Sequence, residues 1–417
     1  MNWDMYTRVS ALMFLEFAVW GAWMPVLALR LLGPLKFTGK QTGWIYATFP
    51  LAGMFSPIIG GYLADKCVNT EWVILACHLA GAILLFVAAK QTKFWGMFWT
   101  MLFYSFFYTA TLPLVSKVLY GHADVAKVDD WVWLWSPVSW ALVGFFLTGL
   151  RQMRKVGGDG PDGLYLAAIL SVAAALVCFV QPATLPQAAA ATSGAEVAAN
   201  PMAQAFGLMA NSSYLIFMLA QLAVSGMMQF YFLGTGQFMQ DRGVSGKNVS
   251  AAMGMAQAVQ AAATILLLKL LIDHTGYQWT LAIGALCWAT LFAVYVVSKG
   301  RLAVTLVQGF HGFAYVFFII AGQKFVSSVA PQEIQGSALS LLSIAVNGIG
   351  LFLGTQLAGF TMQKNSVAGK FQWAKIWSVP LVITLAGALV FAVAFKTPDP
   401  SDFQKAKPEP QKTLALR

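Results

Sequence analysis

One carboxylate stands out among the residues that could do chemistry, because it lies inside a long apolar run. Glu16 sits about eight residues into the run 8–30, with no Lys or Arg at helical spacing from it. A charged side chain at membrane depth is costly, and it typically faces a bundle interior or a water-filled pathway. Glu16 is therefore a candidate for loading and releasing a proton. The alternative is a protonated structural Glu that is held by hydrogen bonds or stays wet near the interface.

Two histidines lie in similar apolar surroundings. His311 is in a stretch, 302–322, that is otherwise uncharged. Its imidazole could bind a polar solute or share a proton with Glu16, or it could be a satisfied interior histidine. His78 follows Cys77 in another apolar run, and we expect it to have a packing role.

Amides and aromatic rings form a second group of candidates. An amide donates and accepts at once, as hydroxyls and nucleobase edges require, although hydrogen bonding between helices is the alternative. Two of the three glutamines are three positions apart and share a helix face. Aromatic rings could stack on a flat or pyranose-like ring. The glutamines are Gln229, Gln257 and Gln260, and the rings are Trp133, Trp140, Phe232 and Tyr315.

The elements that must position these residues are membrane helices. The chain has 417 residues, of which 59% are hydrophobic and only 10% are charged, whereas a soluble domain has about 25% charged residues. A membrane helix needs about 20 largely apolar residues. Twelve runs meet that need, and they predict an all-α protein that spans the lipid bilayer: 8–30, 41–64, 72–90, 94–117, 131–150, 163–182, 211–239, 248–271, 279–298, 302–324, 335–360 and 375–396.

Several other classes of protein are disfavoured. The net charge is +10, but the 26 basic residues are scattered singly between apolar runs, so we expect no nucleic-acid partner. The four cysteines lie far apart without CxxC spacing, so we expect no metal site and no disulfide. Enzyme motifs such as HExxH, the P-loop and GxSxG are absent. The glycines of 348–354 lie in an apolar run, where close helix packing explains them better than a dinucleotide. We therefore expect no enzyme activity and no cofactor.

The chain divides into two halves. A segment rich in Ala, Pro and Gln predicts a linker at 183–210 between six-helix bundles at 1–182 and 211–396, followed by a mobile tail at 397–417. Leu63-x-Asp65-Lys66 ends the second run, and Leu271-x-Asp273-His274 ends the eighth run, about 208 positions later. Matched positions in the two halves indicate duplication, as in transporters built from parallel repeats.

The loop Gly61-x-Leu63-Ala-Asp65-Lys66 and the six-plus-six division resemble the major facilitator superfamily. This resemblance implies a gating role for the loop residues Asp65, Lys66 and Asp273, and it implies cytoplasmic termini. The distribution of Lys and Arg alone favours the opposite orientation. The resemblance decides our expectation of a multi-pass protein of the inner (plasma) membrane with both termini in the cytoplasm.

A closer resemblance is to the bacterial nucleoside:proton symporters, and it covers nearly the whole chain. It rests on motifs in the first, second, third, eleventh and twelfth runs: Phe14-Leu15-Glu16-Phe17 with Trp20-Gly21-Ala22-Trp23, Ala64-Asp65-Lys66, Cys77-His78, Asn347-Gly348-x-Gly350 and Gln372-Trp373. It implies that substrate-binding positions are occupied by Gln229, Gln257, His311 and Tyr315.

The chain departs from that family at other binding positions. An Arg and a Thr of the fifth helix are replaced by Trp133 and Pro137, and a binding Asn is replaced by Phe232. Two acidic positions are Gln260 and Val316, so neither can carry a proton. We expect a monomeric secondary transporter that takes up a nucleoside by proton symport with alternating access. A transporter of a sugar or a related polar solute is the alternative.

Overall fold

Twelve helices in the described part of the chain are long and apolar enough to cross a membrane. The structure is a computed structural model that describes residues 3–122, 131–186 and 201–403. The twelve expected runs all correspond to these helices, often with a few more residues at one end. The fifth, expected at 131–150, extends over Trp131–Arg154. The prediction of an all-α protein with twelve spans is confirmed.

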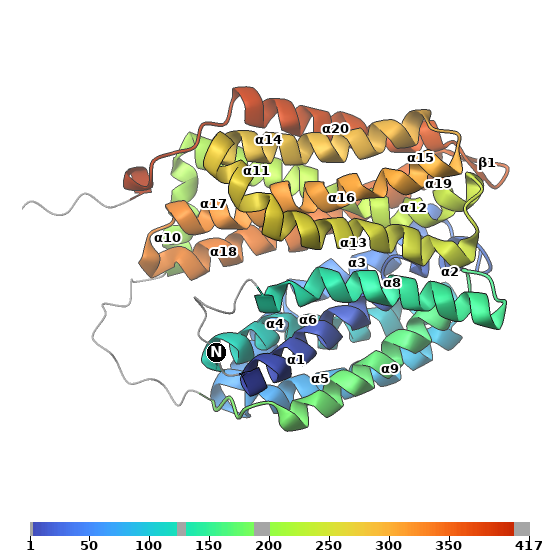
Figure 1. Ribbon diagram of the computed structural model, residues 1–417, viewed down its shortest axis with the longest axis horizontal. Helices are drawn as coiled ribbons and strands as arrows, with labels where there is room; N and C mark the ends of the chain where they lie inside the picture. The colour runs from blue at the N-terminus through green and yellow to red at the C-terminus, as the bar shows by residue number, and fades with distance from the viewer. Residues whose placement is uncertain (1–2, 123–130, 187–200, 404–417) are drawn as a thin grey trace, which may run out of the picture.

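The first six spans form one bundle, drawn from blue to green in Figure 1. Two of them are interrupted, so that the first span consists of α1 and α2 and the second consists of α3 and α4. The elements are α1 (Trp3–Trp23), α2 (Leu27–Leu32), α3 (Gly39–Gly53), α4 (Ser56–Lys66), α5 (Thr70–Lys90), α6 (Phe94–His122), α8 (Trp135–Arg154), α9 (Asp162–Val177) and the 3₁₀ turn η1 (Cys178–Val180).

The second bundle lies beside the first, drawn from yellow-green to red (Figure 1). A short antiparallel hairpin, β1–β2, joins its last two spans. The elements are α11 (Ser212–Gly226), α12 (Met228–Asp241), η3 (Gly246–Asn248), α13 (Val249–Leu266), α14 (Leu268–Val297), α15 (Arg301–Leu306), α16 (Gln308–Ala314), the π-helix η4 (Tyr315–Ile320), α17 (Ala321–Val329), η5 (Gln332–Ile334), α18 (Gln335–Ser343), the π-helix η6 (Ile344–Gly350), α19 (Leu351–Lys364), β1 (Ser366–Val367), β2 (Lys370–Phe371) and α20 (Trp373–Val393).

The segments outside the bundles are only partly described. Within the expected linker, α10 (Pro201–Gly207) and η2 (Leu208–Ala210) precede α11, and α10 packs against α18. Within the expected tail, η7 (Pro400–Phe403) follows α20. The remainder of the linker, 187–200, and of the tail, 404–417, lies outside the described residues. The proposed domain limits and the mobility of the tail stay predictions.

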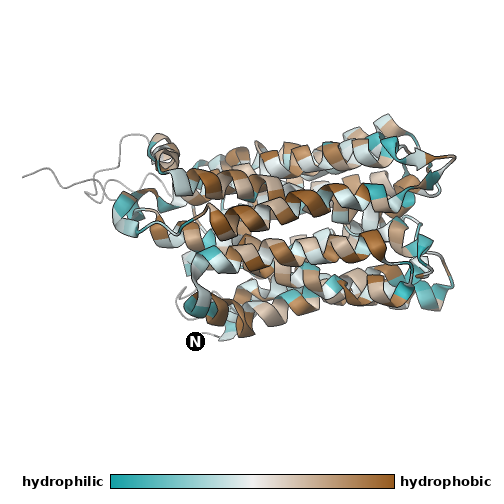
Figure 2. Cartoon of the chain, turned by 90° about the horizontal axis from the view of Figure 1, so that it is seen from above, coloured by the Kyte–Doolittle hydropathy of each residue, from teal (hydrophilic) through white to brown (hydrophobic). Residues whose placement is uncertain are grey.

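The two ends of the molecule need names. We call the end that holds the N-terminus, α10 and η7 the linker side, and the end that holds α2, α15 and the β1–β2 hairpin the distal side (Figure 1). Hydrophobic residues predominate along the middle of the helices, whereas hydrophilic residues gather at both ends (Figure 2). Many large apolar side chains are exposed on this outer surface, including Ile58, Leu219 and Val382. Such a surface suits lipid contact.

The duplicated Leu-x-Asp segments lie at matching places on the linker side. Asp65 is in the last turn of α4, next to the helix end at Cys67. Asp273 lies shortly before Gly276, whose φ of 70° breaks α14 between the eighth and ninth spans. The residues expected to form the loop, 61–66, are instead the last part of helix α4, so the turn begins only after Lys66.

Candidate substrate cavity and buried acid

The two bundles meet tightly on the distal side, along α8 and α13. A Cβ atom added to Gly144 would lie 2.6 Å from the backbone oxygen of Ser250. Thr148 accepts a hydrogen bond from the backbone N–H of Ala251 at 3.0 Å. Arg151 forms an ion pair with Asp162 of its own bundle and donates to the Ser250 hydroxyl of the other bundle at 2.7 Å. This seam closes the distal side between the bundles.

A second distal seam joins α3 to α19. A Cβ atom on Gly43 would lie 2.8 Å from the backbone oxygen of Thr355, and one on Gly39 would lie 2.6 Å from that of Gly359. Only residues without a side chain permit this approach of two helices. The glycines of 348–354 also pack closely, since a Cβ atom on Gly350 would lie 2.9 Å from the backbone oxygen of Leu222 in α11. That prediction is confirmed.

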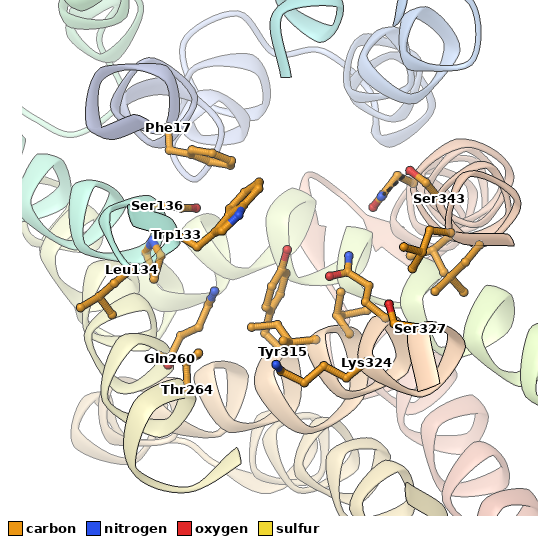
Figure 3. Close-up of a pocket in the computed structure, with 18 of the residues that line it drawn as sticks. Phe17, Trp133, Leu134, Ser136, Gln260, Thr264, Tyr315, Lys324, Ser327 and Ser343 are labelled. Carbon is orange, nitrogen blue, oxygen red and sulfur yellow. Dashed lines mark hydrogen bonds between the residues drawn. The ribbon is translucent and has the colours of Figure 1, made fainter. Parts of the chain in front are cut away.

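A cavity of about 520 Å³ lies between the bundles, away from these seams. Phe17 and Trp133 reach it from the first bundle, and Gln260 and Tyr315 reach it from the second (Figure 3). Its wall mixes aromatic rings, hydroxyls and amides, as small-molecule sites generally do. The other lining residues are Tyr120, Leu134, Ser136, Pro137, Gln221, Thr264, Ile319, Ile320, Gln323, Lys324, Ser327, Leu339, Leu342, Ser343, Val346 and Asn347.

Three of the predicted binding residues, Trp133, Gln260 and Tyr315, therefore line the cavity. Three others line a much narrower pocket of about 10 Å³ beside the α8–α13 seam: Trp140, Phe232 and Gln257. The Trp140 and Phe232 rings, from opposite bundles, lie 6.0 Å apart. In this conformation the predicted residues are thus divided between an open cavity and a closed contact.

The remaining two predicted binding residues are buried inside the second bundle. The imidazole of His311 stacks on Tyr231 at 4.1 Å and meets Trp288 edge-on at 4.7 Å. Its Nδ1 and the Oε1 of Gln229 are buried, and neither has a hydrogen-bond partner among the described residues. Unpartnered buried polar atoms are unusual and call for an explanation.

Glu16 is fully buried and has a hydrogen-bond partner at each carboxylate oxygen. His78 Nε2 lies 2.8 Å from Oε2, and the Thr111 hydroxyl donates to Oε1 at 2.6 Å. His78 Nδ1 lies 3.0 Å from the Ser171 hydroxyl, which itself donates to the backbone oxygen of His78. The chain therefore positions the acid from three other helices, α5, α6 and α9.

This network corrects one expectation. The prediction that His78 has a packing role is wrong, because its ring holds Glu16. The hypothesis that His311 shares a proton with Glu16 stays a prediction, and in this conformation His311 is enclosed by rings of the second bundle. Spacing along one helix could not reveal a partner that a neighbouring helix supplies.

The acid lies one layer behind the cavity. Phe17, the next residue in α1, lines the cavity, and its ring lies 6.2 Å from that of Trp133. Tyr108 donates to the backbone oxygen of Glu16 at 2.7 Å, and its ring lies 6.4 Å from that of Trp20. A change at the acid can therefore reach the cavity wall through α1 itself.

Two π-helical segments face the cavity in the second bundle. Tyr315 begins one of them, η4, and Val346 and Asn347 lie in the other, η6. A π-helical turn inserts a wider ring into an α-helix and often occurs at functional sites. Neither π-helical segment was expected from the sequence analysis.

The predicted gating residues are on the linker side. Asp65 forms an ion pair with Lys117 of α6 at 2.6 Å, and Asp273 forms one with Lys269 at 2.5 Å, one helical turn earlier. Lys66 is exposed at the end of α4. Each of these two ion pairs joins residues of a single half of the chain.

The structure adds cavity residues that the sequence reasoning did not select. Asn347 was noted as part of a family motif, and its amide donates to the Ser343 hydroxyl at 3.2 Å. Gln221, Gln323 and Lys324 were not considered as binding residues, yet all three line the cavity. Gln323 and Lys324 are polar residues at the end of the apolar run 302–324, and that position is the signal from which the sequence analysis could have selected them.

Comparisons with known proteins cover nearly the whole chain. The model of a family described as "Nucleoside H+ symporter" matches residues 3–400. Nucleoside permease NupG of Escherichia coli (strain K12) is 28% identical over 410 residues, which cover 93% of this chain and 95% of that protein. Xanthosine permease of the same organism is 27% identical over 404 residues, with coverage of 93% and 95%.

The solved structures agree on the fold. A crystal structure of the nucleoside transporter NupG matches with a TM-score of 0.81 and 25% identity, over 95% of this chain and 100% of that one. A bacterial homologue of the human lysosomal transporter Spinster, in an inward-facing and unoccupied conformation, matches with a TM-score of 0.70 and 13% identity, over 96% and 95%. The predicted major facilitator fold of two six-helix bundles is confirmed.

Proposed function

Because this chain belongs to the nucleoside H+ symporter family, we propose that it takes up a nucleoside together with a proton. The observation that carries this function is the cavity between the bundles, which is open on one side and closed by the two glycine seams on the other. A transporter of alternating access has this shape in one of its two states. The cavity wall offers both rings for stacking and amides for the edges of a base.

The binding roles divide by location. Trp133 and Tyr315 stack on the solute and Gln260 hydrogen-bonds to it in the present state, since these three line the open cavity. Trp140, Phe232 and Gln257 join the site when the distal seam opens, since they lie beside it. Gln229 and His311 are buried behind these residues with free hydrogen-bonding atoms, which suits a role that begins only when the second bundle rearranges.

Glu16 carries the coupled proton, with His78 as its partner. Two observations support this role: the pair is buried, and α1 connects it directly to the cavity wall. The imidazole and the Thr111 hydroxyl stabilise the carboxylate, and protonation of the pair changes these hydrogen bonds. Asp65, Lys66 and Asp273 act in gating on the linker side.

The protein resides in the inner membrane as a monomer, with the linker side facing the cytoplasm. The state described is then open to the cytoplasm. The twelve apolar spans and the lipid-compatible outer surface support a bilayer location. The positions of the charges favour the reverse orientation, so the orientation needs a test of its own.

Uptake into proteoliposomes tests the function. We expect radiolabelled uridine to accumulate when an inward proton gradient is imposed, and to equilibrate without accumulating when the gradient is collapsed. Glucose and maltose serve as competitors for the alternative substrate class. Accumulation of a sugar but not of any nucleoside would contradict the proposed substrate and show that the protein transports sugars.

Two cysteines test the orientation. Cys67 is exposed on the linker side, and Lys155→Cys, in a protein whose other cysteines are replaced, reports on the distal side. An impermeant maleimide added to intact cells should label position 155 and leave Cys67 unlabelled. The reverse pattern would place the termini outside.

A further inference from the structure

Lys324 is the one charged side chain among the described residues that line the cavity. It lies in α17, one turn beyond the π-helix η4, and its side chain is exposed to the cavity space. Figure 3 shows Lys324 and Tyr315 on the same wall of the cavity, opposite Trp133. A lysine in this position puts a positive charge where a solute binds.

No carboxylate neutralises this charge in the described part of the chain. None of the ion pairs there involves Lys324, and the linker-side carboxylates Asp65 and Asp273 are paired with other lysines. Glu333, which follows in η5, is exposed and forms no ion pair with Lys324. Among the described residues, no carboxylate competes with a ligand for this ammonium group.

The cavity wall offers no negative charge either. Its described lining residues include amides, hydroxyls, aromatic rings and aliphatic side chains, but no Asp or Glu. Gln260, where the resemblance leads us to expect an acid, is a neutral amide whose Oε1 is buried without a partner. A cation between low-dielectric walls that no described carboxylate balances creates a field that attracts anions.

We propose that the cavity selects a solute with a negative charge, a nucleoside-like compound whose anionic group pairs with Lys324. The nucleoside moiety of this solute rests on the proposed function, and the inference adds that the solute carries a negative charge. The rings of Trp133 and Tyr315 hold the flat part of the solute, while the ammonium group binds the anion by a charge-assisted hydrogen bond.

Matched pairs of ligands test the charge separately from the nucleoside. Binding to the purified protein is measured by titration calorimetry for uridine and uridine-5′-carboxylate, and for glucose and glucuronate. We expect uridine-5′-carboxylate to bind about tenfold more tightly than uridine, as one charge-assisted contact would provide. That preference should disappear in Lys324→Gln and persist in Lys324→Arg.

Lys396→Gln is the matched control, because Lys396 is exposed on the same side of the same bundle and is not part of the cavity wall. It should keep the preference of the wild type. Equal binding of uridine and its carboxylate, a preference that survives Lys324→Gln, or no binding of either acid would overturn the inference. If uridine binds but its carboxylate is not preferred, this inference fails and the proposed nucleoside function stands. If glucuronate binds and neither uridine nor its carboxylate does, the proposed nucleoside function fails and the selection of an anion stands.

Discussion

At the scale of single residues, the buried acid and its imidazole partner show how the fold makes an isolated charge tolerable. Glu16 and His78 are 62 positions apart in the sequence and meet with both side chains out of contact with solvent. A buried contact between an acid and an imidazole is weak evidence for stability, because desolvation of the polar groups opposes their attraction. The presence of such a pair inside an apolar bundle therefore favours a function for Glu16 and His78. Two substitutions can test this.

Replacing Glu16 by Gln should abolish proton-driven accumulation and leave exchange of substrate measurable, since glutamine imitates the protonated acid. Uptake into proteoliposomes with and without a pH gradient measures both. Glu71→Gln is the control, because Glu71 is also buried in the first bundle but holds the backbone N–H of Thr184 at the linker side. Accumulation by the Glu16 variant at the level of the wild type would exclude this residue as the proton carrier.

A double-mutant cycle should show that Glu16 and His78 act as a pair. His78→Leu leaves a buried carboxyl oxygen of Glu16 without its hydrogen-bond partner, which costs roughly 1–3 kcal/mol in the free energy of unfolding. In a Glu16→Leu background the same change should cost less, with a coupling energy of about 0.5–3 kcal/mol. Chemical denaturation in detergent measures the four proteins, and Cys77→Ala, which breaks no bond to Glu16, should be additive. Additive costs for Glu16 and His78 would contradict the pairing.

The sequence predicted the residues of this site only in part. Glu16 could be found because a charge in an apolar run is rare. Its partner could not be found, because the helical period relates residues of one helix and says nothing about the neighbouring one. The same limit explains why His311 was joined to Glu16 in the prediction but is enclosed by Tyr231 and Trp288 in the structure.

At the scale of helices, glycines decide where the two bundles can touch. Gly144 permits α8 to lie against α13, whereas Gly149 of the same helix has nothing within 4 Å of an added Cβ atom. Overpacking a tight contact costs about 1–3 kcal/mol. The distal seam is therefore a place where one methyl group can shift the balance between two conformations.

Gly144→Ala should open the distal side. Met253, which lies beside the seam and is buried, serves as a reporter when changed to Cys in a protein without its native cysteines. We expect its labelling by an impermeant maleimide to rise severalfold in the Gly144→Ala protein. Gly149→Ala should leave the labelling rate unchanged, and the same increase in both variants would point to general loosening instead.

Spans were easier to predict than their interruptions. The apolar runs had the right number and approximate bounds because length and hydropathy alone decide whether a helix can cross a bilayer. The break of the second span between α3 and α4 and the π-helices η4 and η6 were not expected. These features depend on the contacts of each turn with neighbouring helices, and composition does not record such contacts.

At the scale of the whole molecule, the structure shows one state of a two-state cycle, and a cross-link can hold it there. Thr148 and Ala251 face each other across the distal seam. After both are changed to Cys in a cysteine-free protein, oxidation should stop uptake while substrate binding from the open cavity continues. A reducing agent should restore uptake, and each single variant should be insensitive to oxidation. Uptake that continues after complete cross-linking would exclude movement at this seam.

Which side is closed could not be predicted from the sequence. Glycines occur along both bundles, and the duplicated Leu-x-Asp segments mark only the linker side of each half. Which side is closed depends on the difference in free energy between two conformations, and that difference is the sum of many contacts between the halves. Two states that differ by a few kcal/mol are not distinguished by helix-forming patterns.

The buried acid makes all its hydrogen bonds within the first bundle, whereas most of the polar cavity wall, including Lys324, belongs to the second. If Glu16 carries the proton and Lys324 selects the anionic group, as we propose, proton coupling belongs to the first bundle and most of the substrate selection belongs to the second. Either half can then diverge without disturbing the task of the other, provided that the glycine seams still fit. A chimera that combines the first six helices of this chain with the last six of a relative should inherit its cargo from the second parent and its driving ion from the first.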